Sequence, residues 1–230
     1  LAGQSSGEKS FDSPIKDLDM NTKTTLNLIN YGLKNKCKKI IYASSMSVYG
    51  NSNNKKFDEN STLNPLSCYG VSKLCSEAYL KVFSNHLPYT IFRMFNVYGT
   101  GQDMGDLRQG MVSIYLSQAL KKNKIIVKGS LKRKRDFIHI DDVVNIWIKS
   151  IKRKKINQIY NLGSGKNMKV SRLIKKITKL TGDKKIIQMS GTKGDQFTSI
   201  TDNKKIKKDL NYKKFIDIND GLKKFYYNQV

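Results

Sequence analysis

Apolar residues recur along the chain at two spacings, and the two spacings alternate between successive segments. Within residues 13–36 they follow the three-and-four spacing of an amphipathic helix, for which Ser13-Pro14 is a favourable beginning. Short apolar runs at 39–44 and 89–95 predict buried strands, and residues 67–85 predict a helix between them. This alternation predicts the α/β class with a doubly wound parallel sheet, whose ligand binds at the carboxyl ends of the strands.

The second half of the chain shows shorter and more varied elements. We expect strands and helices, in chain order, at 110–122 (helix), 125–128 (strand), 136–140 (strand), 141–152 (helix), 158–162 (strand), 171–180 (helix) and after Asp202 and Asp217 (two basic helices). The polar stretch 51–64 is expected to be a mobile loop. Residues 163–166, Gly-Ser-Gly-Lys, are interpreted as a turn before a helix that Ser171 caps. A phosphate loop would require a glycine five residues before the last one, and Ser or Thr after the lysine.

The formal charge of +25 raises the question of a nucleic-acid partner. The basic residues are 37 lysines and only 6 arginines, and the lysines are spread over many predicted elements. Recognition of base edges favours the rigid fork of arginine, so we expect no nucleic-acid partner.

Other compositional features argue against a membrane protein and against a metal site. No apolar run approaches the roughly 20 residues of a membrane span, so no membrane association is expected. The three cysteines form no Cys-x-x-Cys pair and the two histidines are far apart, so we expect neither disulfides nor a metal. A reducing, cytoplasmic location is the expectation.

A serine, a tyrosine and a lysine are placed where they can share one proton. Ser45 ends the first predicted strand, and Tyr69 and Lys73 lie four residues apart on one face of the next helix. A tyrosine needs a pKa about three units below its usual value to act as a base at neutral pH, and a cation about 4 Å away supplies roughly the required 4 kcal/mol. The serine hydroxyl would hold the reacting oxygen. A lone Tyr-x-x-x-Lys is more often an ordinary amphipathic pair, but the preceding serine strand favours proton transfer here.

Together with several other segments, this arrangement resembles the extended short-chain dehydrogenase/reductases, in particular the nucleotide-sugar epimerases and dehydratases. The matching segments follow one another in the family's order at 1–6, Asn21, 43–50, 67–73, 93–99, 135–142 and 160–165. The resemblance implies a Rossmann-type sheet, an NAD cofactor, a UDP-sugar substrate and a homodimer through the helices near Asp17 and Ser76. It further implies that 1–95 form the C-terminal part of the NAD-binding domain, and that 96–230 form mainly a substrate lobe, with some segments returning to the sheet.

Roles follow from the resemblance position by position. It implies that Ser45, Tyr69 and Lys73 are catalytic and also contact the cofactor, and that Ser45 and Tyr69 contact the substrate. Further cofactor positions are matched by Leu1, Ala2, Gly3, Asn21 and Phe95. Further substrate positions are matched by Ser47, Asn96, Arg135 and Lys193. The alternative for Arg135 is a surface member of the basic run 132–135, and Lys193 lies only near the place of a second diphosphate-binding arginine.

The residues after Ser45 separate the branches of the family. Dehydratases typically carry acidic residues there, whereas this chain has Met46 and Ser47, which cannot transfer a proton at neutral pH. The resemblance therefore implies an NAD-dependent 4-epimerase of the UDP-glucose/UDP-galactose type. The alternatives are an NAD(P)-dependent dehydratase or reductase of the same superfamily and, in another class, a non-catalytic basic module that binds nucleic acid.

The family's glycine-rich strand-turn-helix, which holds the NAD pyrophosphate, is missing from the sequence, and Leu1-Ala2-Gly3 resembles the end of a buried strand. We therefore expect that the chain begins within a domain. For the 230-residue chain by itself, we expect negligible NAD binding, no epimerase activity and a tendency to aggregate, because an edge strand would be exposed. Calorimetric titration with NAD beside a thermal melt tests this expectation, and micromolar binding to a cooperatively folded chain would contradict it.

Overall fold

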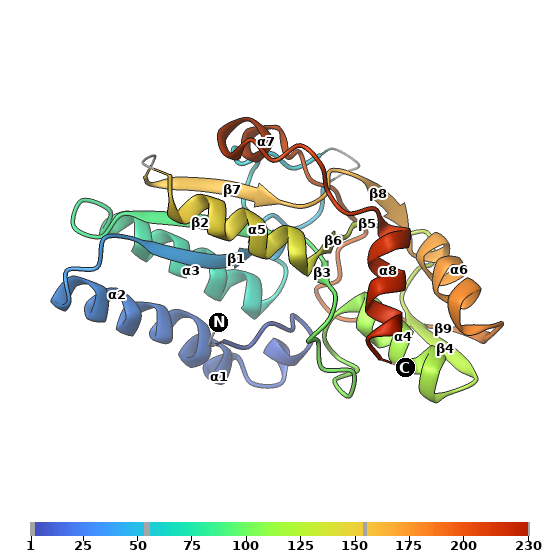
Figure 1. Cartoon of the computed structure of the whole chain (residues 1–230). Helices are drawn as coiled ribbons and strands as arrows, with labels where there is room; N and C mark the ends of the chain where they lie inside the picture. The colour runs from blue at the N-terminus through green and yellow to red at the C-terminus, as the bar shows by residue number, and fades with distance from the viewer. Residues whose placement is uncertain (1–2, 53–55, 154–155, 230) are drawn as a thin grey trace.

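The computed structural model describes residues 3–52, 56–153 and 156–229. Its central sheet consists of three parallel strands, β1 (Ile40–Ser45), β2 (Tyr89–Met94) and β7 (Gln158–Leu162), in the order β1-β2-β7. The α/β class and the parallel sheet are thus confirmed (Figure 1). β7 comes from the second half of the chain, so the chain returns to the sheet after residue 96.

Helices cover both faces of this sheet, and each face has its own apolar core. On one face, α2 (Thr24–Lys34) and α3 (Cys68–Val82) bury Ile29 and Leu80 against Tyr42 and Ile91 of the strands. On the other face, α5 (Ile140–Ile151) and α7 (Lys204–Leu210) pack on Phe92, Tyr160 and Leu162. Burial on both faces explains why the strands are nearly continuous apolar runs.

The first predicted helix is interrupted. It begins at Pro14 as expected, but α1 (Pro14–Leu18) passes into a π-helical turn, η2 (Asp19–Lys23), before α2 begins. Ser13 makes no capping hydrogen bond with its side chain. Single π-helical turns are frequently found at functional sites, and this one contains Asn21.

A second body is built from the later elements around another apolar core (Figure 1). Its elements are α4 (Met111–Lys121), β4 (Lys124–Lys128), β5 (Lys134–Asp136), β8 (Asn167–Lys169), α6 (Val170–Thr181), β9 (Lys185–Met189), β10 (Thr198–Ser199) and α8 (Ile218–Tyr227). Leu116, Val127, Leu173 and Phe225 are fully buried there. None of the helices in the described part of the chain is both long and apolar enough to cross a membrane.

Residues 136–140 do not form one strand, contrary to the sequence-based expectation. β5 ends at Asp136, and a separate strand, β6 (Ile138–His139), pairs with β3 (Val97–Tyr98) before α5 begins. At Asp136, where the chain leaves one sheet, the buried carboxylate is held by the turn at 163–165. Ser164 Oγ and the amides of Ser164 and Gly165 donate to it at 2.6, 2.9 and 2.8 Å.

These bonds also show what the Gly-Ser-Gly-Lys turn does. Its amides face an internal carboxylate, so the rejection of a phosphate loop agrees with the contacts. The cap expected at Ser171 is wrong, because α6 begins one residue earlier without a side-chain cap. The strand β8, which the sequence did not predict, separates the turn from the helix.

The predicted loop at 51–64 is partly packed. Residues 53–55 lie outside the described residues, but Phe57 is buried and its ring stacks on Tyr49 at 4.5 Å between centroids. Phe57 also bonds through its backbone to Ile200 and Asp202. This part of the loop was expected to be mobile, and an aromatic residue within a polar stretch is the signal against it.

Candidate active site

A large cavity of about 1080 Å³ lies at the carboxyl ends of β1 and β2. Ten of the predicted site residues line it, namely Gly3, Asn21, Ser45, Ser47, Tyr69, Lys73, Phe95, Asn96, Arg135 and Lys193. Leu1 and Ala2 lie outside the described residues. Residues that are far apart in the sequence are thus brought together where a doubly wound sheet binds its ligand.

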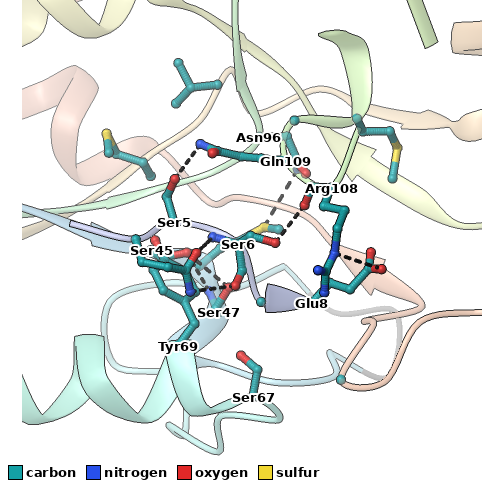
Figure 2. Close-up of a pocket in the computed structure, with 18 of the residues that line it drawn as sticks. Ser5, Ser6, Glu8, Ser45, Ser47, Ser67, Tyr69, Asn96, Arg108 and Gln109 are labelled. Atoms are coloured by element: carbon teal, nitrogen blue, oxygen red, sulfur yellow. Dashed lines mark hydrogen bonds and ion pairs between the residues drawn. The ribbon is translucent and has the colours of Figure 1, made fainter. Parts of the chain in front are cut away.

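Ser45 and Tyr69 meet at this end of the sheet (Figure 2). Ser45 is the last residue of β1 and caps the short 3₁₀ helix η3 (Met46–Val48). The backbone amide of Ser47 donates a hydrogen bond to Ser45 Oγ at 3.2 Å. The Ser45 hydroxyl donates to Ser47 Oγ at 3.1 Å, and it lies close enough to the Tyr69 hydroxyl to influence the pKa of the phenol. Gly70 allows this approach, because a Cβ there would lie 2.6 Å from the Ser47 carbonyl oxygen.

The electrostatics around Tyr69 differ from the sequence-based expectation. Burial raises the pKa of Tyr69 above its usual value, and the Ser45 hydroxyl opposes this only in part. Burial also lowers the pKa of Lys73 to about 8, against the attraction of Asp17. The ammonium of Lys73 lies 5.6 Å from the centre of the Tyr69 ring, and its desolvation weakens the charge that was expected to activate the phenol.

Unpartnered polar atoms lie beside Lys73, on η2 and α1. Asn21 is 3 % exposed, donates to Asp17 Oδ1 at 3.2 Å, and leaves its Oδ1 without a partner. Asp17 Oδ2 is likewise buried without a hydrogen bond. Gly3 leaves space here, because a Cβ would come within 2.9 Å of Asn21 Oδ1. Buried polar groups normally have a partner, so this corner fits a ligand that offers hydroxyl or amide groups.

Residues for a whole dinucleotide are not all present. The ribose and nicotinamide end fits Lys73, Tyr69 and the unpartnered amide oxygen of Asn21. Within 3–52, 56–153 and 156–229, no glycine-rich strand-turn-helix offers amides for the pyrophosphate. In the same residues, no group of three or more His, Cys, Asp or Glu could hold a metal ion.

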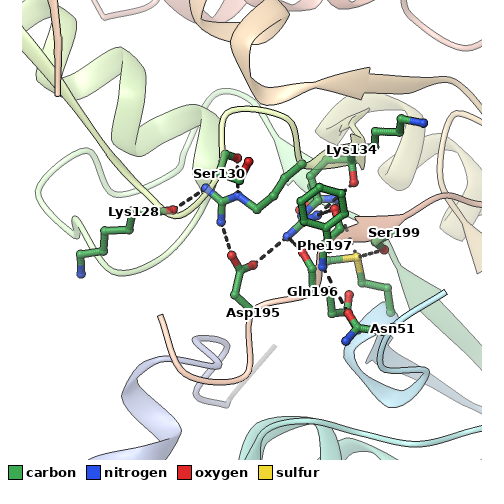
Figure 3. Close-up of polar contacts among 12 residues, drawn as sticks. Asn51, Lys128, Ser130, Lys134, Asp195, Gln196, Phe197 and Ser199 are labelled. Atoms are coloured by element: carbon green, nitrogen blue, oxygen red, sulfur yellow. Dashed lines mark hydrogen bonds and ion pairs between the residues drawn. The ribbon is translucent and has the colours of Figure 1, made fainter. Parts of the chain in front are cut away.

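Two buried arginines share one carboxylate on another wall of the cavity. Arg135 Nη2 donates to Asp195 Oδ1 at 2.7 Å, and Arg133 Nη1 donates to Asp195 Oδ2. Asp195 lies at the centre of these contacts (Figure 3). Arginine stays protonated in proteins, so the three groups carry one net positive charge, although burial lowers the pKa of Arg135. The nitrogens of Arg135 also donate to the backbone carbonyls of Lys134, Gln196 and Phe197, so what the cluster offers an anion in the cavity is its net positive charge.

The predicted substrate residues differ in how they are placed. Arg135 is 2 % exposed and is therefore not part of a surface charge cluster. Lys193 is exposed, and its ammonium lies 4.8 Å from the centre of the Phe11 ring. Asn96 lines the cavity, and its Nδ2 donates to the carbonyl of Asp136 at 2.8 Å.

Arg133 and Asp195 are the residues that the sequence reasoning missed. Arg133 was grouped with the exposed basic run 132–135, yet it is 5 % exposed. The available signal was the two-residue spacing between Arg133, which directly precedes β5, and Arg135 within it, because this spacing repeats on one side of an extended chain. The sequence also did not indicate the ion pair between Glu8 and Arg108, two residues that line the cavity (Figure 2).

The parallel sheet, the cavity at its carboxyl edge and the Ser-Tyr-Lys set define a dinucleotide-dependent enzyme class of the short-chain dehydrogenase/reductase type. Residues 1–163 match the model of the family described as "NAD dependent epimerase/dehydratase family". The chain belongs to this family.

Relatives in the family differ in their named activities. The chain is 34 % identical over 227 residues to a putative UDP-glucose 4-epimerase of Methanocaldococcus jannaschii, covering 97 % of this chain and 73 % of that protein. It is 32 % identical over 195 residues to a dTDP-4-dehydro-6-deoxyglucose reductase of Escherichia coli, covering 83 % of this chain and 61 % of that protein. Among solved structures, UDP-glucose 4-epimerase of Thermotoga maritima with UDP-glucose superposes with a TM-score of 0.93 at 31 % identity. That match covers all of this chain and 76 % of that one.

Lys73→Met is expected to stabilise the fold. Because burial lowers the pKa of Lys73 to about 8, the unfolded chain binds more protons between pH 8 and 10.5, and the burial penalty is fully present below pH 8. The substitution should raise the free energy of unfolding by about 1–3 kcal/mol at pH 7, and this gain should vanish above pH 10.5. Urea unfolding of both proteins at pH 7 and at a pH above 10.5 measures this difference in the free energy of unfolding.

The matched control is Lys81→Met on the exposed face of the same helix, for which we expect a change within about 0.5 kcal/mol. Equal stability of the Lys73→Met and parent chains at pH 7 would show that the lysine is solvated.

Proposed function

We propose that this chain carries out proton transfer and substrate binding in an NAD-dependent nucleotide-sugar 4-epimerase of the UDP-glucose/UDP-galactose type. The observation that carries the proposal is the cavity that joins the Ser45-Tyr69 contact to a buried cluster with one net positive charge. The first feature suits oxidation of a sugar hydroxyl, and the second suits a diphosphate. The names of the Methanocaldococcus jannaschii and Thermotoga maritima proteins support this choice.

The carboxylates of the cavity favour epimerisation over dehydration. Among the described lining residues, only Glu8 and Asp195 carry carboxylates. Glu8 pairs with Lys128 at 2.7 Å, and Asp195 is occupied by two arginines. Met46, at a place where dehydratases are expected to carry an acid, accepts a hydrogen bond from Ser199. Removal of water from the sugar needs a further acid and base, whereas epimerisation needs only the Tyr69 hydroxyl and a ketone that can turn.

Each residue of the set has a distinct task in this reaction. Tyr69 takes the proton of the sugar C4 hydroxyl and later returns it to the oxygen of the turned ketone. Ser45 donates a hydrogen bond to that oxygen and keeps it within reach of the phenol. Arg135 and Asn96 hold the diphosphate while the sugar turns, and Ser47 orients the sugar beside Ser45. Lys193 contributes a more distant positive charge at the rim.

The fit of the chain to NAD is best at the ribose and nicotinamide end. NAD, when bound, supplies the acceptor for the hydride of C4 and a positive charge near the phenol. Lys73 and Asn21 would hold its ribose and amide groups, with Gly3 and Phe95 forming the adjacent wall. The raised pKa of Tyr69 in this structure makes an added positive charge important for its function as a base.

A dehydratase or reductase is the second candidate, because the Escherichia coli relative is named as a reductase and a human relative as a dTDP-D-glucose 4,6-dehydratase. Product analysis separates the candidates. With UDP-glucose and NAD, an epimerase yields UDP-galactose of unchanged mass, and a dehydratase yields a product lighter by one water. A reductase would instead convert a keto-sugar nucleotide, supplied with reduced cofactor, to the hydroxy sugar and consume one equivalent of that cofactor.

We also propose a homodimer in a reducing cytoplasm, without nucleic acid as a partner. Several apolar side chains are exposed on the outer side of α1 and α3, among them Ile15 at 73 % and Val82 at 74 %. Exposed apolar patches of this kind are typical of protein interfaces. Asp17 and Ser76 themselves are buried within one chain. Sedimentation velocity of the gene product tests the dimer, and a monomer at micromolar concentration would exclude it.

Tyr69→Phe is expected to lower kcat by roughly 10²–10⁴-fold in the gene product that contains this chain, because the acid-base group is lost. The affinity for UDP-glucose should change less than about threefold, since the diphosphate contacts remain. Conversion of UDP-galactose to UDP-glucose and calorimetric binding measure the two effects. The control is Tyr79→Phe, farther along the same helix and 36 % exposed, which should keep parental activity. Near-parental turnover by Tyr69→Phe would refute the mechanism.

Arg135→Gln is expected to raise KM for the UDP-sugar by roughly 10–100-fold and to change kcat little. The variant loses a hydrogen-bonded cation, and such a bond is worth about 1.5–3 kcal/mol. Lys132→Gln removes an exposed charge of the same basic run and should leave KM unchanged. An unaltered KM in Arg135→Gln, in a protein that melts normally, would show that the buried charge serves the fold alone.

A further inference from the structure

Glu77 is a buried carboxylate on α3 that the proposed reaction does not use. It follows Tyr69 by eight residues and Lys73 by four, so the three side chains share one face of the helix. Its oxygens accept hydrogen bonds from Arg93 Nη2 at 2.7 Å and from Arg93 Nε at 3.0 Å. Both side chains are at most 2 % exposed. Because both oxygens of Glu77 are bonded to a permanent cation, it is not suited to exchange protons with a substrate.

Glu77 joins the helix to the strand that carries Ser45. The hydroxyl of Ser44 donates to Glu77 Oε1 at 2.5 Å, and Ser44 is the register partner of Arg93 across β1 and β2. One carboxylate therefore holds both strands against α3. Since Ser45 follows Ser44 directly, this contact lies next to the hydroxyl that meets Tyr69.

The network continues beyond Arg93 and holds the guanidinium from its other side. Arg93 Nη1 donates to the Tyr49 hydroxyl at 2.9 Å, and that hydroxyl donates to Asn161 Oδ1 at 2.6 Å. Asn161 lies on β7 as the register partner of Arg93, and it is fully buried. Ser44, Arg93 and Asn161 thus form one row across β1, β2 and β7. Ser44 and Arg93 bond directly to Glu77 on α3, and Asn161 is connected to it through Tyr49 and Arg93.

Stability alone is a weak reason for such a pair. Replacing a buried ion pair by apolar residues of similar size is often neutral or stabilising. A directional network, unlike apolar packing, fixes how far a helix can slide along a strand, and a misplacement of about 1 Å at a reacting centre can cost about a hundredfold in rate. We propose that Glu77 and Arg93 are positioning residues that set the position of α3 along β1, so that Tyr69 and Lys73 meet Ser45. The inference rests on the proposed function for its kinetic consequence.

The test replaces both charges in the gene product that contains the chain. Glu77→Met with Arg93→Met keeps the side-chain volumes and leaves no unpaired charge. We expect a melting temperature within a few degrees of the parent, kcat lower by about tenfold to a hundredfold, and KM for UDP-glucose within about twofold. Asp19→Met with Lys23→Met, an exposed ion pair on η2, is the matched control and should keep parental kcat. A double variant that melts normally and keeps kcat within threefold of the parent overturns the proposal.

A second variant decides the case in which the double variant does not fold. Glu77→Asp retains the charge but shortens the side chain by one methylene, which pulls α3 or breaks the Ser44 contact. We expect a kcat at least about fivefold below the parent in a folded protein. Parental kcat in a folded Glu77→Asp protein would overturn the proposal.

One readout is independent of the substrate. The pH dependence of Lys73 acetylation, followed by peptide mass spectrometry, should have its midpoint near pH 8 in the parent and move toward 10.5 in the double variant, or in Glu77→Asp if the double variant does not fold. An unchanged midpoint in the folded variant overturns the positioning role whether or not the protein is an epimerase. A parent that epimerises no UDP-sugar would refute the proposed function and leave the labelling test valid.

Discussion

The contact between α3 and the carboxyl end of β1 is the constraint on which the site depends. Gly70 brings the first turn of the helix within reach of the Ser47 backbone, and Ser67 caps that turn by accepting a hydrogen bond from the Gly70 amide at 3.1 Å. Two turns farther on, Glu77 ties the helix to Ser44. The helix is held at both ends of the segment that carries Tyr69 and Lys73. The parallel pairing of β1 and β2 then puts Ser45 and Phe95 at the same edge, where the cavity opens.

Buried charges divide into two kinds in this molecule. Glu77 and Arg93 are compensated within the network, so they add no net field to the cavity. The cluster of Arg133, Arg135 and Asp195 keeps one positive charge. A buried charge without a partner is costly, and a charge that faces a cavity can be compensated by a ligand. This difference separates residues that support the site from residues that bind.

The sequence predicted most long elements to within one to three residues, because their apolar periods were clear. The exceptions are local, and each has a physical cause. The π-helical turn at 19–23 continues a helical pattern, so spacing alone does not reveal it. The short strands β3, β8 and β10 have two or three residues, too few for a period, and they exist through pairing with distant segments. The five-residue strand β9 was also not predicted, and it exists through its pairing with β4.

For the site, the resemblance gave the residues of the cavity but not their surroundings. Arg133 was interpreted as a surface charge because its neighbours are lysines, although its spacing of two from Arg135 was a signal that both side chains turn inward. The expected activation of Tyr69 by Lys73 assumed a solvated cation. Burial of both groups reverses that estimate, and burial is a property of the fold that a spacing of four residues does not contain.

Two of the cations that line the cavity, Arg135 and Lys73, respond differently to pH. Arg135 remains charged at every pH at which the protein is folded, so the attraction for a diphosphate is constant. Lys73, with a pKa of about 8, changes its charge within the range in which enzymes work. Under the proposed function, a permanent charge would therefore govern diphosphate binding, and a variable charge would govern proton transfer. Since Tyr69 is protonated in the buried state, a positive charge brought by a bound ligand acts on an oxygen that solvent cannot screen. The phenol of Tyr69 would then act as a base only while the ligand is bound, and it would stay protonated in the empty cavity.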